Sequence, residues 1–307
     1  MKIFQTTSQF KSHKKTIVTL GTFDGVHLGH QKVLQKVIQS ARELDSESLV
    51  LTFYPHPQFI LNPNSDIKLL NTIDEKCNLL DNLGLQNLVI QAFNQQFSEM
   101  EAEDFVKNIL VDNFNVQKII VGYDHRFGKN RAANFDDLVG FGKKYGFDVA
   151  QISAEQSNEI SISSTKIRNA ISNNDLDISR NYLGYDYFFS AKVIKGNQIG
   201  RTLGFPTANL KIDEAHKLLP KSGVFAVEIE FGSIVFNGIM NIGNRPTIEG
   251  KNQTVEVHIF DFEQDIYDKT LKIIFKSFIR NEQKFESLQA LKIQLEHDKR
   301  EAQLFFN

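Results

Sequence analysis

The first half of the chain alternates short apolar runs with amphipathic stretches. Five runs of aliphatic and β-branched residues have the composition of buried strands: Thr16–Leu20, Leu49–Phe53, Leu88–Ile90, Lys118–Val121 and Val149–Ile152. After the first run, apolar residues recur at helical spacing at Leu34, Val37, Ile38, Ala41 and Leu44. Strands that alternate with helices predict a parallel, doubly wound, Rossmann-like α/β sheet.

Polar residues predict where several of these helices begin. Thr72 with Glu75, and Ser98 with Glu101, have the spacing of capping boxes. Asn134 is placed to cap a further helix, which we expect to end at Gly146.

The pattern changes near residue 184, where we place the boundary between domains 1–184 and 185–307. Two alternating segments, 224–231 and 234–240, flank Gly232-Ser233, which predicts a two-residue hairpin turn. Leu271–Phe278 adds a strand, and Phe285–Phe306 has a helical pattern. Four leucines of that helix lie on or near one face: Leu288, Leu291, Leu295 and Leu304. The second half is therefore expected to be a small antiparallel β-barrel with a C-terminal helix.

Composition narrows the classes of partner and compartment. The chain has 307 residues, enough for two domains, and 35 Lys and Arg against 37 Asp and Glu give a net charge of -2. Without a long basic block, nucleic acid is not an expected partner. The single cysteine, Cys77, the absence of a signal-like amino terminus and the lack of a long apolar run favour the cytoplasm and no membrane partner. The sequence does not indicate an oligomeric state.

The segment GTFDGVHLGH, residues 21–30, has the features of a phosphate site. It connects a predicted strand to a predicted helix, whose first N–H groups and positive dipole end favour an anion. Gly21 and Gly25 permit close backbone approach, and His27 and His30, three residues apart, are able to face one ligand. Ordinary surface histidines are the alternative. A zinc site would need further ligands, which the nearby sequence does not suggest.

Two other segments of the first half are ambiguous when taken alone. FYPHP, residues 53–57, carries the chain away from the end of a predicted strand, and His56 could contact a ligand or cap the loop. ISSTKIR, residues 162–168, places Ser163, Ser164 and Thr165 at a predicted helix start. This segment is either an ordinary N-cap or a second anion-binding helix start.

A glycine-rich segment of the second half, GNQIGRTLGFPTANL at 196–210, also has two interpretations. Gly196, Gly200 and Gly204 allow a loop to close over phosphates, while Thr207 and Asn209 place two oxygen donors on one side of an extended chain. Such a pair could complete the shell of a Mg²⁺ ion held mainly by nucleotide phosphates. The alternative is a glycine-rich barrel connection.

Several separated blocks resemble one enzyme family. GTFDGVHLGH resembles the opening motif of the FMN adenylyltransferase module in bacterial bifunctional riboflavin kinase/FAD synthetases, and ISSTKIR resembles its second nucleotide motif. GYDHRFGKNR, residues 122–131, resembles the loop of that module that meets the flavin. Three later blocks resemble riboflavin kinase: GIMNIGNRPTIEG at 238–250, TVEVHIFDF at 254–262 and FIRNEQKF at 278–285.

The resemblance implies phosphorylation of riboflavin to FMN, then transfer of an adenylyl group from ATP to FMN, giving FAD and pyrophosphate. It implies ATP as co-substrate and Mg²⁺ or another divalent metal, held by Thr207 and Asn209. The implied catalytic residues are Glu256, as general base for the ribityl hydroxyl, and His27, His30 and Arg168. Residues implied in ATP binding are Gly21, Phe23, Gly25, His27, His30, Ser164, Thr165, Arg168, Gly196, Gly200, Arg201, Thr207 and Asn209. Those implied in flavin binding are His56, Asp124, Phe127 and Arg245.

Other functions remain open at this stage. The chain has His125 where the family has an aromatic residue, and Ala133-Asn134 where Gly-Asp is usual. These departures are the basis for an alternative hypothesis, a flavin-nucleotide binding or regulatory protein with kinase activity only and a silent first half. A nucleotidyltransferase for another small phosphate is a third hypothesis, which the kinase-like blocks oppose. Without those blocks, Glu256 would be a surface glutamate beside Val255 and Val257.

Overall fold

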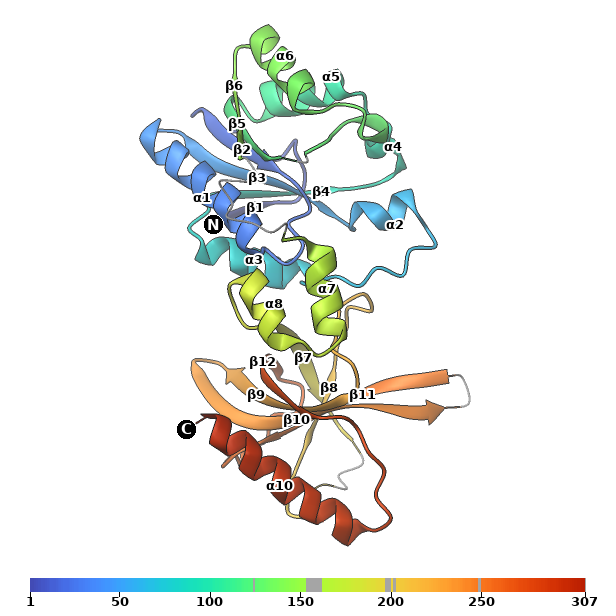
Figure 1. Cartoon of the computed structure of the whole chain (residues 1–307). Coiled ribbons are helices and arrows are strands. Elements are labelled where there is room, and N and C mark those ends of the chain that lie inside the picture. Colours follow the sequence, from blue (N-terminus) through green and yellow to red (C-terminus); the bar gives the residue numbers. More distant parts are fainter. Residues whose placement is uncertain (124, 153–161, 197–199, 201–202, 248–249, 307) are drawn as a thin grey trace. The chain divides into compact units, whose positions relative to one another are not determined.

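A computed structural model shows that the chain forms two compact units (Figure 1). It describes residues 1–123, 125–152, 162–196, 200, 203–247 and 250–306, with backbone alone for 244–252. The first unit comprises residues 1–67 and 73–163, and the second comprises 68–72 and 164–307. No helix among the described residues is long and apolar enough to cross a membrane.

The first unit is built on a parallel sheet with the strand order β1-β4-β3-β2-β5-β6. Its strands are β1 (Lys2–Phe4), β2 (Thr16–Leu20), β3 (Glu47–Tyr54), β4 (Asn87–Ala92), β5 (Val116–Gly122) and β6 (Asp148–Ile152). The five predicted strands are confirmed, because β-branched and aliphatic side chains fill a sheet buried on both faces. The three-residue edge strand β1 was not predicted.

Helices cover both faces of this sheet, as a doubly wound fold requires (Figure 1). Leu34 of α1 and Leu80 of α3 pack with Val50 in one cluster, whereas Leu110 and Leu138 pack with Leu51 on the opposite face. The helical segments are α1 (Leu28–Glu43), α2 (Pro57–Leu61), α3 (Ile73–Asn82), α4 (Gln95–Ser98), α5 (Ala102–Asp104), the π-helical η1 (Phe105–Asn113), the 3-10 turn η2 (Lys129–Arg131) and α6 (Phe135–Tyr145).

Two predicted helix starts have different outcomes. Asn134 caps α6 in a capping box with Asp137, and the helix ends at Gly146 in the left-handed conformation, as predicted. The predicted start at Ser98 is wrong, because Ser98 is the last residue of α4. Its hydroxyl donates to the Gln95 carbonyl, and the cap of α4 is Asn94.

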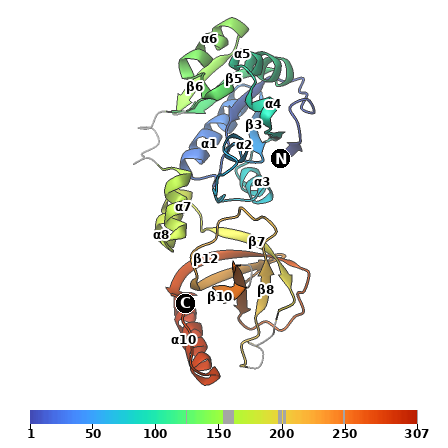
Figure 2. The ribbon, with the colours of Figure 1, turned by 90° about the vertical axis from the view of Figure 1, so that its right-hand side faces the viewer.

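The second unit contains the predicted closed antiparallel barrel, with the strand order β10-β11-β8-β7-β12-β9 (Figure 2). Its strands are β7 (Phe188–Ile194), β8 (Ala208–Lys211), β9 (Gly223–Phe231), β10 (Ile234–Thr247), β11 (Gly250–Ile259) and β12 (Thr270–Arg280). Phe231 pairs with Ile234, and Gly232 has a positive φ of 65°, so the predicted two-residue hairpin turn is confirmed.

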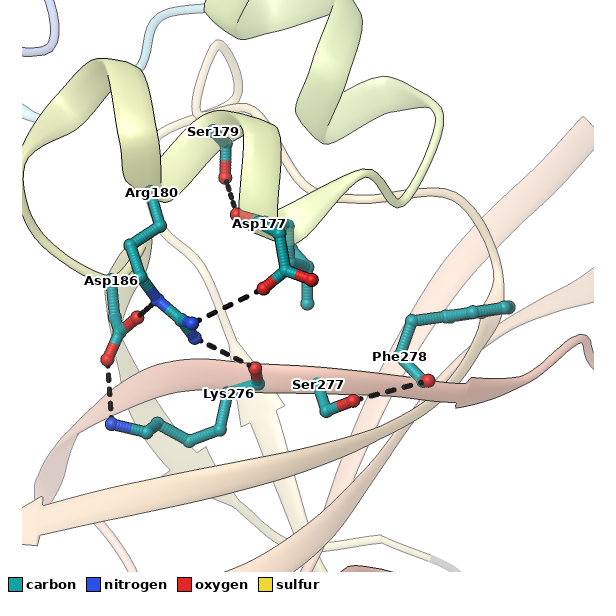
Figure 3. A network of polar contacts seen from close by, with 8 residues as sticks. Asp177, Ser179, Arg180, Asp186, Lys276, Ser277 and Phe278 are labelled. Carbon is teal, nitrogen blue, oxygen red and sulfur yellow. Dashed lines mark hydrogen bonds and ion pairs between the residues drawn. The ribbon is translucent and has the colours of Figure 1, made fainter. Parts of the chain in front are cut away.

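Two short helices, α7 (Ser164–Ser172) and α8 (Leu176–Leu183), belong to the same unit as the barrel. Arg180 of α8 reaches β12, where it donates to the Lys276 carbonyl over 3.0 Å (Figure 3). Arg180 and Lys276 also share the Asp186 carboxylate between them. A charged network therefore attaches α8 to the barrel.

The segment 68–72 comes from the first half of the sequence but packs within the second unit. Leu69 forms a parallel bridge with Lys217, whose buried ammonium group donates to the carbonyls of Leu70 and Phe188 over 2.7 and 2.8 Å. The same ammonium group lies 4.7 Å from the ring centroid of Tyr187. Sequence patterning gave no indication of this packing.

The C-terminal helix α10 (Leu288–Phe306) packs on the outside of the barrel against β9, β10 and β12 (Figure 2). The helix was predicted, but its inward face is not the expected row of leucines. Leu288 and Leu304 are exposed, whereas Asp298 and Ala302 are buried. Asp298 is buried because the Arg280 guanidinium pairs with both of its carboxylate oxygens, over 2.8 and 2.7 Å.

Candidate active sites

The predicted phosphate turn lies between β2 and α1. Gly25, Phe23 and Val26 have positive φ values of 88°, 47° and 36°, so two non-glycine residues adopt a left-handed conformation that neighbouring groups must stabilise. Lys76 of α3 donates from Nζ to the Thr22 carbonyl over 2.7 Å, and the Thr52 hydroxyl donates to the same oxygen over 3.3 Å. Contacts from α3 and β3 thus hold the turn.

His27 and His30 come together at the start of α1. Their rings stack with centroids 3.6 Å apart at an angle of 18°. His27 is the N-cap, and its Nδ1 accepts the His30 backbone N–H over 3.4 Å. In a neutral His27 ring, Nε2 is therefore the nitrogen that carries the hydrogen and can donate to a phosphate.

His30 is held as a neutral ring. Burial, followed by the neighbouring His27 and Lys76, holds the pKa of His30 well below its ordinary value of 6.5. Its Nδ1 atom is buried and has no hydrogen-bond partner among the residues that the structure describes. Buried polar atoms in proteins normally have a hydrogen-bond partner. A bound ligand would supply that partner for His30 Nδ1.

Lys76 contacts this turn from α3 and Asp24 lies within it, and sequence patterning predicts neither residue as part of the site. Lys76 is 6% exposed and Asp24 is 2% exposed. Burial lowers the pKa of Lys76, and the Asp24 carboxylate opposes that shift. The available sequence signal was a lysine four residues before Leu80, on the apolar face of a predicted helix.

The remaining predicted residues of the first unit have structural contacts. His56 caps α2, because its Nδ1 accepts the Gln58 N–H over 3.2 Å. The Phe127 ring is buried in the core cluster beside Phe105, and Phe23 packs with Val26 in another core cluster. These contacts neither require nor exclude flavin or ATP, so the predicted binding roles stay predictions. Asp124 lies outside the described residues.

The second predicted nucleotide segment begins α7, within the second unit. Ser164 and Thr165 are the first two residues of that helix, which confirms the predicted helix start. The Arg168 Nε atom donates to the Lys68 carbonyl over 2.7 Å. One edge of this guanidinium group is therefore engaged by the segment 68–72, and the role of Arg168 toward ATP stays a prediction.

In the barrel, Thr207, Asn209 and Glu256 form one cluster. Asn209 of β8 is the direct partner of Glu256 on β11, so the two side chains share a face of the sheet. The Thr207 hydroxyl lies 3.4 Å from Glu256 Oε2. Val255 and Val257 point into the core, and Glu256 is partly exposed on the other face, as alternation predicts.

Two glycines make this cluster possible. A Cβ atom on Gly196 would lie 2.0 Å from the Asn209 side-chain nitrogen, and one on Gly200 would lie 2.2 Å from the Phe205 carbonyl oxygen. Any larger residue would displace the Asn209 amide or open the loop. Arg201 lies outside the described residues, and the structure describes only the backbone of Arg245, in β10.

The cluster has the chemistry of a magnesium–nucleotide site. A hydroxyl, an amide oxygen and a carboxylate are hard oxygen donors, and Mg²⁺ completes such a partial shell with water and phosphate oxygens. Groups of three or more His, Cys, Asp or Glu that could hold a metal on their own do not occur in the described part of the chain. The oxygen donors of Thr207, Asn209 and Glu256 fit a Mg²⁺ ion whose shell nucleotide phosphates and water complete.

The chain thus combines a Rossmann-like sheet that carries a histidine-bearing turn with a barrel that places oxygen donors beside a carboxylate. The FAD synthetase family model matches residues 9–166, and the riboflavin kinase family model matches residues 183–306. The chain belongs to the family of bifunctional riboflavin kinase/FMN adenylyltransferases.

Individual relatives agree with that assignment over nearly the whole chain. The bifunctional riboflavin kinase/FMN adenylyltransferase of Haemophilus influenzae is 40% identical, over 94% of each chain. The Bacillus subtilis enzyme of the same name is 37% identical, over 95% of this chain and 93% of its own. A crystal structure from Streptococcus pneumoniae, described as a macrolide-efflux protein, shares the fold with a TM-score of 0.88 at 29% identity, covering 98% of both chains.

Proposed function

We propose that the chain makes FAD in two steps, each of which consumes ATP. Residues 185–307 phosphorylate riboflavin to FMN, and residues 1–184 transfer an adenylyl group from ATP to FMN. The family assignment supports both activities, and the cluster of Thr207, Asn209 and Glu256 carries the assignment of the first step to the barrel. The partners are ATP, riboflavin, FMN and FAD, and a reducing cytoplasm suits a chain with the single cysteine Cys77.

In the kinase step, a neutral hydroxyl must become a nucleophile. Glu256 accepts the proton of the ribityl 5′-hydroxyl while that oxygen forms a bond to the γ-phosphorus of ATP. The bond from the γ-phosphorus to the bridging oxygen breaks, and ADP leaves. Thr207 and Asn209 would hold Mg²⁺, which supplies charge neutralisation at the phosphates. Partial exposure of Glu256 keeps its carboxylate accessible to substrate.

In the adenylyl-transfer step, the nucleophile is an ionised phosphate and requires no base. An FMN phosphate oxygen forms a bond to the α-phosphorus of ATP, the bond to the β-phosphate bridge breaks, and pyrophosphate leaves. His27 donates from Nε2, and the neutral His30 ring stacked against it fixes the direction of that donor. Positioning and charge stabilisation of this kind are what a step that needs no base requires.

Three observations support an active first half over the alternative in which it is silent. Asn134 caps α6 through the backbone N–H groups of Asp136 and Asp137, which an aspartate oxygen would also accept. Ala133 is buried in the core cluster and pairs with Phe127 through its backbone, so a methyl group is accommodated there. The His125 ring stacks on Phe127, with centroids 5.9 Å apart. None of the three departures removes a donor from the His27–His30 turn.

The substitution Glu256→Gln tests the division of labour. It keeps the size of the side chain and one acceptor oxygen but removes the proton acceptor, so phosphorylation of riboflavin should fall by roughly 10² to 10⁴. Addition of FMN should then restore FAD formation, because the FMN phosphate needs no activation. Glu263→Gln, an exposed site beyond β11, is the matched control. Near-normal phosphorylation by Glu256→Gln, or failure of FMN to rescue FAD synthesis, would contradict the proposal.

A further inference from the structure

The hydrogen-bond ladder between β8 and β11 ends beside the kinase cluster. Pairing runs from Leu210 with Val255 to Ala208 with Val257, and the next pair would set Thr207 opposite His258. The chain leaves the sheet there because Pro206 has no N–H to donate. The His258 Nδ1 atom instead lies 2.8 Å from the Pro206 carbonyl oxygen. Since a carbonyl only accepts, Nδ1 carries the hydrogen, and the side chain replaces a missing ladder bond.

The His258 ring is itself fixed by its surroundings. It is 8% exposed and lies between the Phe205 and Phe260 rings, with centroid distances of 5.3 and 5.8 Å. Phe205 is held in turn by Gly200, to whose carbonyl its N–H donates over 2.8 Å. The segment 205–207 is therefore fixed on both sides, and it is joined to β11 by the bond of His258 to the Pro206 carbonyl and by the contact of the Thr207 hydroxyl with Glu256.

We infer that His258 is a positioning residue of the kinase site, which holds the Pro206–Thr207 peptide so that Thr207 lies beside Glu256. The expected effect on riboflavin phosphorylation rests on the proposed kinase function. The hydrogen bond between His258 and Pro206 does not depend on that function. His258 and Glu256 are two residues apart on β11 and share a face, so one strand supplies both the base and the support of the opposing loop. Groups that orient a metal or phosphate ligand typically contribute about 10- to 100-fold in affinity or activity.

Two amide substitutions separate this role from a general packing role. The Asn amide nitrogen occupies the same position along the side chain as Nδ1, whereas the Gln amide nitrogen occupies that of Nε2. His258→Asn should therefore keep the hydrogen bond to Pro206, and His258→Gln and His258→Leu should lose it. All three are made in the full-length chain, where FAD formation from added FMN reports on the other active site.

The first measurement is amide hydrogen exchange in the peptide that covers residues 207–210. Exchange there should be roughly tenfold faster in the Gln and Leu variants, on the scale of one lost hydrogen bond, and near the parental rate in the Asn variant. The second is the riboflavin phosphorylation rate as a function of Mg²⁺ concentration. The Mg²⁺ concentration for half-maximal rate should rise about 10- to 100-fold in the Gln and Leu variants and recover in the Asn variant.

Unchanged exchange in all three variants, or equal losses in Asn and Gln, would overturn the inference, because neither pattern follows from a bond made by Nδ1. Faster exchange in Gln and Leu with an unchanged Mg²⁺ requirement would overturn the functional consequence. A parent chain that makes FAD from FMN but no FMN from riboflavin would refute the proposed kinase function instead. In that case the exchange pattern alone would still decide whether His258 positions the loop.

Discussion

At the residue scale, the stacked His27 and His30 rings are the distinctive feature of the first site. Two imidazolium cations with ring centroids 3.6 Å apart would repel each other, and burial further disfavours charge on His30. The neutral His30 ring therefore adds no charge to the proposed phosphate site, which relies on the helix start and the backbone of the turn. Lys76 supports this arrangement through the Thr22 carbonyl.

We expect His27→Ala and His30→Ala each to slow FAD formation from FMN at least about tenfold, the scale of one lost charge-stabilising contact. Formation of FMN from riboflavin should be unaffected, because that step is assigned to the other half. Initial rates of both reactions check this, with the exposed His13→Ala as control. Parental FAD synthesis in both variants would limit the two histidines to a structural role at the start of α1.

The spacing of residues allowed His27, His30, Thr207 and Asn209 to be predicted as site candidates, because each pair lies within one short segment. Residues whose partners are distant in the sequence could not be found this way. Lys76 acts on Thr22, and His258 acts on Pro206, and each contact forms only once separate elements have packed. In the sequence, Lys76 is only a lysine on the apolar face of a predicted helix, and His258 is only a polar residue that alternates with Val257.

At the scale of elements, periodicity located most helices and strands but not which side of α10 faces the barrel. Periodicity predicts the apolar side of α10 as its buried face, whereas Asp298 is fully buried and Leu304 is exposed. A buried carboxylate is stable only with a close partner, and Arg280 lies on β12, beyond the reach of any helical pattern. Strand β1 was missed for a related reason, since three residues are too few to show alternation.

The Arg280–Asp298 pair should be essential for the attachment of α10. Asp298→Asn leaves the mostly buried Arg280 guanidinium without its counter-charge, and removal of one partner of a buried pair typically costs about 3–5 kcal/mol. Amide exchange of α10 should then be about 10²-fold faster or more, whereas exchange of α1 in the other unit should not change. Glu301→Gln, on the exposed side of α10, is the control. Equal α10 protection in Asp298→Asn and the control would refute this role.

At the scale of the whole molecule, packing and sequence order divide the chain differently. The sequence pattern changes near 184, yet α7, α8 and the segment 68–72 pack within the unit that contains the barrel. Packing shows which segments lie together, and it does not show which reaction each part catalyses. The boundary at 184 therefore stays a prediction. The difference arises because Arg180, Lys217 and Leu70 bond to partners that sequence periodicity does not reveal.

Two fragments test how much the added helices contribute. A fragment of residues 164–307 keeps the contacts of Arg180 with Asp186 and the Lys276 carbonyl, and one of residues 185–307 loses them. With Arg180 partly exposed and its charge screened, we expect the longer fragment to be more stable by about 1 kcal/mol, which raises its melting temperature by about 4 °C. Both should phosphorylate riboflavin. Equal melting temperatures would show that α8 adds no stability to the barrel.

The most direct test of the account is chromatography of the flavins formed when the pure full-length chain is incubated with riboflavin, ATP and Mg²⁺. We expect FMN to appear first and FAD then to accumulate at its expense, with pyrophosphate formed in step with FAD. FMN without FAD would contradict the adenylyl-transfer assignment and restore the hypothesis of a silent first half. Unchanged riboflavin, together with no FAD from added FMN, would contradict both activities.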